Sequence, residues 1–95
     1  MDRFLEVTKL IEAAQQKGVN FGKSNPYNRL RYYTKIRLLP HMERRRNSEG
    51  NIVGHYPEWA LDRLRYIEKL KDEGLENEEI ARRIAEQNAK QTTFK

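Results

Sequence analysis

The chain has 95 residues, enough for one small domain and too few for a second hydrophobic core. It carries 19 lysines and arginines against 14 aspartates and glutamates, a formal net charge of +5. The absence of cysteine excludes disulfides, thiolate metal sites and a cysteine nucleophile. No stretch approaches the ~18 consecutive apolar residues of a membrane span, and the first residues mix charges where a secretion signal is apolar. We therefore expect a cytoplasmic protein with no membrane association.

The positive charge is concentrated in one quarter of the sequence. Residues 23–46 contain eight lysines and arginines and one acidic residue, Glu43, for a net charge of +7, while the rest of the chain is nearly balanced. A surface that only needs solubility mixes its signs. Concentration of one sign favours a polyanionic partner, because each neutralised phosphate releases condensed counterions. A basic surface without a partner is the alternative interpretation of the composition.

The first half of the chain predicts two helices. Apolar residues recur at helical spacing over residues 4–17, and the first helix is expected to end at Lys17 and Gly18. Asn25 and Pro26 are typical of a second helix start, because asparagine caps free N–H groups and proline has no N–H to leave unpaired. Pro40 ends that segment.

The second half predicts a hairpin and two further helices. Short strands are expected at residues 42–46 and 52–56, around a turn cluster at 47–51. A third helix follows Pro57 and ends at Gly74. A fourth helix begins near residue 76 or 77 and is expected to bury Ile80, Ala81, Ile84 and Ala85.

This order of elements predicts a fold that is mainly α with a small β-hairpin wing. It is the order of a winged helix-turn-helix with four helices. We expect this domain to cover residues 1–88 and residues 89–95 to form a flexible C-terminal tail, because they carry no periodic pattern.

The second helix is expected to turn a polar, cationic face to solvent. With Leu30 at the centre of the inward face, a step of about 100° per residue also places Tyr27, Tyr33, Thr34 and Arg37 inward, with Arg37 expected to lie past the helix end. Arginine can bind guanine or phosphate in a bidentate manner, lysine acts as a point charge, and an asparagine amide can read adenine. The outward face, which has this composition, carries Asn28, Arg31, Tyr32 and Lys35, with Arg29 at its flank.

The first strand of the hairpin carries three consecutive arginines, Arg44, Arg45 and Arg46. Because successive strand residues point to opposite faces, at most two of them share a face. The sequence leaves open whether Arg44 and Arg46, or Arg45 alone, reach the backbone or the minor groove of DNA. Charge that protects an edge strand from aggregation is the alternative. His55 is a further candidate DNA contact, with hydrogen bonding to the turn or backbone as its other interpretation.

Three segments, in this order, resemble the MerR family of bacterial transcription regulators. Residues 30–40, LRYYTKIRLLP, are similar to the family's recognition-helix signature, which usually reads LRYYExxGLLxP. Residues 55–67 resemble the end of its wing and its third helix, and residues 70–75 and 78–80 resemble its second wing and fourth helix. Thr34 stands where glutamate is usual, and Arg37 stands where glycine is usual.

The resemblance implies that the second helix enters the major groove of double-stranded DNA, with the wing along the backbone. It implies a sequence-selective transcription regulator. Such regulators usually continue into a dimerising helix and an effector domain, so the sequence leaves open a regulator reduced to its DNA-binding domain or a fragment of a longer protein. No cofactor, metal or small-molecule effector site is expected, and self-association is expected only on DNA. The predicted DNA-binding residues are Asn28, Arg29, Arg31, Tyr32, Lys35, Arg44, Arg45, Arg46 and His55.

Two other classes of function stay open on sequence alone. An excisionase-like or phage-packaging architectural module would bend DNA with weaker sequence preference. An RNA-binding or protein-docking module is the third class. RNA binding is less favoured, because the chain lacks an exposed aromatic run of the kind that stacks unpaired bases. No enzymatic activity is predicted, since the sequence contains no nucleophile–base set, phosphate loop or carboxylate pair at a catalytic spacing.

Overall fold

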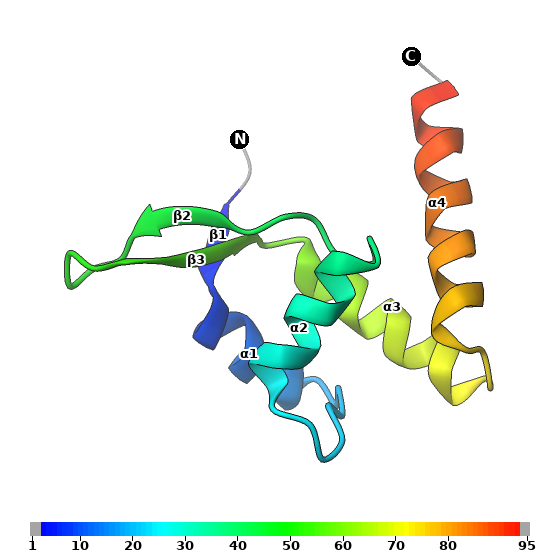
Figure 1. Cartoon of the computed structure of the whole chain (residues 1–95), viewed down its shortest axis with the longest axis horizontal. Coiled ribbons are helices and arrows are strands. Elements are labelled where there is room, and N and C mark those ends of the chain that lie inside the picture. The colour runs from blue at the N-terminus through cyan, green and yellow to red at the C-terminus, as the bar shows by residue number, and fades with distance from the viewer. Residues whose placement is uncertain (1–2, 94–95) are drawn as a thin grey trace.

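The structure, a computed structural model, describes the backbone of residues 3–93 and the side chains of residues 3–87. Figure 1 shows a β-hairpin extending to one side of the helices, a long C-terminal helix on the other side, and the second helix between them. This arrangement confirms the predicted winged helix-turn-helix. In chain order the described elements are β1 (Phe4–Glu6), α1 (Val7–Gln16), α2 (Pro26–Lys35), β2 (Glu43–Arg46), β3 (Ile52–Pro57), α3 (Ala60–Asp72) and α4 (Asn77–Thr93).

The first residues of the domain differ from the sequence-based expectation. Phe4–Glu6 form strand β1, and helix α1 begins only at Val7. β1 pairs antiparallel with β3, so that the sheet has the order β1-β3-β2. The helical spacing of Phe4 and Val7 is a local pattern, whereas the partner of β1 comes from a distant part of the chain. The prediction of helix over residues 4–6 is therefore wrong.

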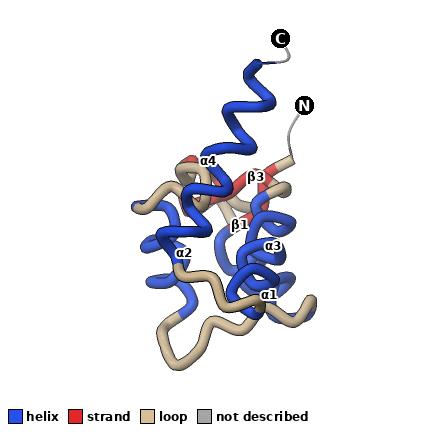
Figure 2. Tube along the Cα trace, turned by 90° about the vertical axis from the view of Figure 1, so that its right-hand side faces the viewer, coloured by secondary structure: helices blue, strands red, loops and turns tan. Residues whose placement is uncertain are grey.

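The helices and the sheet share one hydrophobic core. α1 contacts α2, α3 and β3, and α3 also contacts α4. Figure 2 shows α2 on one side of the domain and α1 with α3 on the other. Each helix contributes at least one fully buried side chain to this core, and α2 contacts α1 directly. The largest fully buried side chains are Tyr56, Leu10, Leu30, Leu38, Leu64, Ile67, Ile80 and Ile84.

Helix α4 has a narrower buried face than the sequence predicts. Ile80 and Ile84 are buried and Ala81 is partly buried, whereas Ala85 is exposed. The prediction for Ala85 is wrong because α4 packs mainly against α3 and has one stripe covered. The backbone of α4 is helical to Thr93. The division of the chain into a domain over residues 1–88 and a flexible tail over residues 89–95 stays a prediction.

A part-buried pair of hydrogen bonds at Thr34 attaches α2 to the sheet. Thr34 Oγ1 on α2 donates to the carbonyl oxygen of Leu30 at 2.8 Å, and the Tyr56 hydroxyl on β3 lies 2.7 Å from Thr34 Oγ1. Because the Thr34 hydrogen is used for Leu30, Tyr56 donates in the second bond. Tyr56 is fully buried and Thr34 is partly buried, so water has limited access to this bond. The bond fixes which face of α2 turns outward.

Tyr56→Phe tests this attachment, since it removes the hydroxyl and keeps the ring in the core. We expect the free energy of unfolding to fall by about 1 kcal/mol. In a domain of this size that loss lowers Tm by about 4–8 °C in a thermal melt. An unchanged Tm would show that the bond does not hold α2.

The same variant has a signature at alkaline pH. Burial raises the pKa of the Tyr56 hydroxyl above its ordinary value of 10.0, against a smaller opposing effect of the Thr34 hydrogen bond. The unfolded chain therefore loses this proton at lower pH than the folded chain. The contribution of Tyr56 to stability is complete below about pH 10 and declines as the pH rises through the raised pKa. Tyr56→Phe should remove that part of the alkaline loss of Tm, whereas Tyr32→Phe, which alters an exposed hydroxyl, should retain it.

Candidate nucleic-acid interface

The outward face of α2 has the orientation that the sequence predicts. On the inward side Leu30 and Tyr33 are buried. The helix contains no acidic residue, so its exposed face is uncharged or cationic along its whole length. Its start is fixed by Asn25, whose side-chain oxygen accepts the Tyr27 N–H at 2.9 Å. The four residues predicted to face outward are all exposed, namely Asn28, Arg31, Tyr32 and Lys35.

Tyr27 does not lie in the core, although helical spacing predicts it there. It is 39% exposed and borders a hollow with Val7, Met42 and Ile52. The first turn of α2 extends beyond the part of the helix that contacts the core, so its inward side meets the hairpin. Tyr27 thereby belongs to the surface that joins α2 to the wing.

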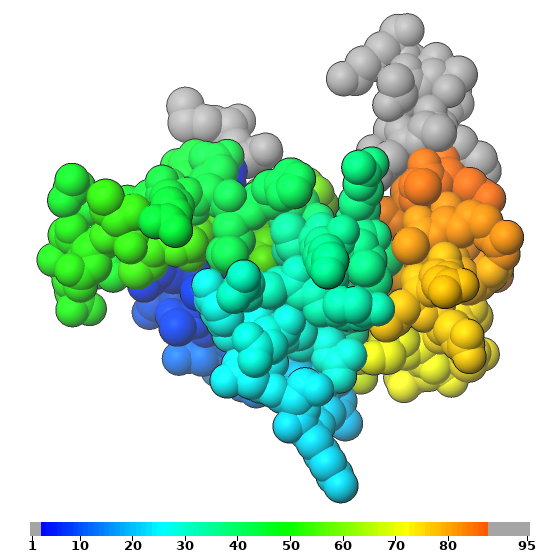
Figure 3. Space-filling model, viewed as in Figure 1, coloured from blue at the N-terminus to red at the C-terminus, as the bar shows by residue number. Residues whose placement is uncertain are grey.

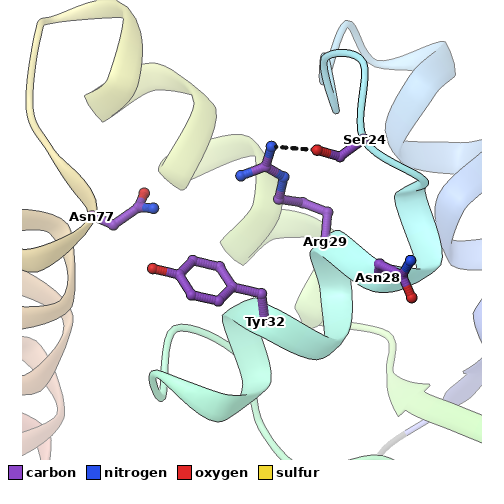
Figure 4. A pocket seen from close by; sticks show the side chains of 5 residues that line it. All are labelled: Ser24, Asn28, Arg29, Tyr32 and Asn77. Atoms are coloured by element: carbon purple, nitrogen blue, oxygen red, sulfur yellow. Dashed lines mark hydrogen bonds between the residues drawn. The ribbon is translucent and has the colours of Figure 1, made fainter.

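Arg29 turns to the other side of α2, toward the beginning of α4. Its guanidinium donates to Ser24 Oγ at 3.0 Å and lies 6.0 Å from the centre of the Tyr33 ring. In Figure 4 the side chains of Arg29, Tyr32 and Asn77 border one space, Ser24 lies against the Arg29 guanidinium, and the Asn28 amide points away.

This hollow between α2 and α4 is suited to an anion. It has a volume of about 330 Å³ and is lined by Ser24, Asn28, Arg29, Tyr32 and Asn77. The lining contains one guanidinium, two hydroxyls and two amide groups that can donate, and no carboxylate. Such donors match the oxygens of a phosphate. The sequence analysis did not predict Ser24 or Asn77 as site residues, because Ser24 lies in the turn before α2 and Asn77 begins a distant helix.

The three arginines of β2 divide between the two faces of the sheet. Arg44 borders the hollow that faces α1 and α2. Arg46, two residues further along the strand, lies on the same face of the sheet. Arg45 turns the opposite way, where its guanidinium lies 3.8 Å from the centre of the Phe4 ring and 3.0 Å from Glu43 Oε1. All three remain exposed. Of the eight cations between residues 23 and 46, Arg45 is the one that pairs with a carboxylate among the described residues.

A second hollow, of about 430 Å³, connects the wing with α2. Arg44 and Ile52 border it from the hairpin and Tyr27 borders it from α2. Gly54 on β3 leaves room for Met42, since a Cβ at Gly54 would lie 2.6 Å from Met42 Sδ. Figure 3 shows the surfaces of the hairpin (green), α2 (cyan) and the start of α4 (yellow) side by side on one face of the molecule.

Arg46 and His55 are partly committed to contacts within the hairpin. Arg46 Nη1 donates to the Gly50 carbonyl at 2.9 Å, across the turn. His55 is 8% exposed, and its Nδ1 lies 2.9 Å from the Val53 carbonyl. Because a carbonyl only accepts, Nδ1 carries the hydrogen. This placement favours the predicted backbone role of His55 over direct contact with a ligand.

Residues 12–87 match the family described as MerR HTH family regulatory protein. The chain belongs to this family. The match extends from α1 into α4 and so includes α2 and the whole hairpin. A helix-turn-helix domain of the MerR family is a DNA-binding domain of a transcription regulator. No curated protein and no solved structure matches the chain.

Two further observations concern the described residues of this MerR domain. None of its clusters of histidine and acidic side chains has the three members that a metal ion needs. None of its helices is long and apolar enough to cross a membrane.

Proposed function

We propose that the chain binds double-stranded DNA with sequence selectivity, as a transcription regulator of the MerR type. The observation that carries this proposal is the exposed face of α2, where Asn28, Arg31, Tyr32 and Lys35 stand together with no acidic neighbour on the helix. An α-helix fits the major groove, and these residue types bind base edges and phosphates there. We propose that the protein acts in the cytoplasm of a bacterium.

Base reading is assigned to the middle of α2. Arg31 and Lys35 lie one helical turn apart on the exposed face, so both can reach into the same groove. Arg31 is suited to a guanine in a bidentate manner, and Asn28 to an adenine. Lys35 supplies positive charge at the end of the helix.

Phosphate binding is assigned to the two sides of α2. On one side, Arg29, Tyr32 and Asn77 converge on the anion-compatible hollow next to α4. On the other side, Arg44 projects from the wing at the edge of the hollow shared with Tyr27. Contacts of this kind fix the register of a protein on the duplex and supply most of its salt-dependent affinity. Several copies of the chain are proposed to assemble on repeated sites.

The salt dependence of binding tests this assignment. If five to seven of the eight cations in residues 23–46 meet phosphates, log affinity should fall against log salt with a slope of about −4.5 to −6. Fluorescence anisotropy of a labelled duplex measures it. A slope near −1 would contradict the interface.

A double variant locates the charge that matters. Arg31→Ala with Lys35→Ala should relax the sequence preference through the loss of Arg31 and make the slope less negative by about 0.9 through the loss of the Lys35 charge. Stability should change little, since both positions are exposed and alanine favours a helix. Arg65→Ala is the matched control: Arg65 is exposed on α3 and borders a hollow with Lys17, Glu68 and Asp72, away from α2.

The two faces of β2 give a separate prediction. Arg44→Ala should lower DNA affinity several-fold and make the salt slope less negative by about 0.9. Arg45→Ala should leave the slope nearly unchanged and lower stability by about 0.5–1 kcal/mol, since it removes the stacking on Phe4. Anisotropy titrations and thermal melts of both variants measure this difference. Equal losses of affinity would contradict the division of the arginines between the faces.

A further inference from the structure

The residue that follows α2 and its cap has an unusual backbone conformation. Arg37 has φ of +68°, and the other described residues with positive φ are all glycines. A side chain with a Cβ is disfavoured there, because the Cβ approaches the following carbonyl oxygen. Glycine, the usual residue of the MerR signature at this position, has no such conflict.

The surrounding structure fixes Arg37 in this conformation. The Arg37 N–H donates to the Thr34 carbonyl at 3.1 Å, and the Leu38 N–H donates to the Tyr33 carbonyl at 2.8 Å. These two bonds close the helix end in the pattern that needs a left-handed residue. Leu38 is fully buried, and its carbonyl accepts from Arg63 Nη1 at 3.1 Å. The turn is therefore set by the core.

The side chain of Arg37 gains no compensating contact. It is exposed, and within the described residues its guanidinium forms no hydrogen bond, ion pair or stacking contact. A cation is favourable near a helix C-terminus, but Lys35 already stands in the last turn of α2. A strained residue at the end of the proposed recognition helix, whose guanidinium has no partner within residues 3–87, indicates a binding function.

We propose that Arg37 binds a backbone phosphate of the DNA duplex at the C-terminal end of α2. The inference rests on the proposed function. In a helix-turn-helix the N-terminal part of the recognition helix meets base edges, so we infer that its C-terminal end leaves the groove beside the sugar–phosphate backbone. A guanidinium there can hold two phosphate oxygens at once.

Arg37→Gly separates binding from folding, because the same change relieves strain and removes the guanidinium. We expect Tm to rise by about 2–6 °C. DNA affinity should fall by about three- to tenfold at moderate salt, with a slope less negative by about 0.9 and an unchanged sequence preference. If Arg37 had only a structural role, its loss would not raise Tm and weaken DNA binding at the same time.

Two variants and one control complete the experiment. Arg37→Lys should keep the slope and the parent's Tm, since it retains both the charge and the strain. Arg37→Asn should reproduce the loss of slope, because asparagine tolerates this conformation without charge. Arg65→Ala removes one positive charge elsewhere and should leave the slope unchanged.

The outcomes that overturn the inference are distinct. If the parent binds duplex DNA and Arg37→Gly binds as tightly with the same slope, the assignment of Arg37 is wrong. Loss of sequence preference at an unchanged slope would overturn the phosphate assignment, and a lower Tm for Arg37→Gly would overturn the argument from strain. A parent chain that binds no duplex contradicts the proposed function itself, and the inference falls with it.

Discussion

The hydrogen bond between Tyr56 and Thr34 is the contact on which the arrangement of the interface depends. It joins the central strand of the sheet to the helix that carries the cationic face, between a fully buried tyrosine and a partly buried threonine. Leu30 and Tyr33 pack beside it and fix the same rotation of α2. With α2 held in this orientation, Arg31 and Lys35 turn outward. The hollow next to the wing and the hollow next to α4 then lie on either side of the helix.

The positive charges between residues 23 and 46 differ in whether they have a partner within the protein. Most of the cations between residues 23 and 46 form no ion pair among the described residues, whereas Arg45 is held by Glu43 and Phe4. An unpaired exposed cation adds little to folding stability, because solvent screens its interactions. It remains available to a polyanion, whose condensed counterions it can replace. The strained backbone at Arg37 fits the same division between folding and binding.

The sequence predicts those features that depend on local patterns. The faces of α2 follow from a single helical period that starts at Asn25 and Pro26, and the structure agrees except at Tyr27, whose turn lies beyond the core. Strand β1 was not predictable, because its partner is distant in sequence. The sequence could not predict which of Arg44 and Arg45 faces away from α2, because this is shown by the contact of Arg45 with Phe4. It could not predict the anion-compatible hollow either, because Asn77 reaches it from a distant helix.

The central claim is that α2 reads a DNA sequence, and selection from a pool of randomised duplexes tests it most directly. The account predicts that the parent chain enriches a short motif, recurring at about one helical turn if copies bind side by side, and that the variant with Arg31→Ala and Lys35→Ala does not. Salt-sensitive retention of DNA without enrichment would contradict the claim and favour an architectural module. Absence of retention at low salt would contradict DNA binding altogether.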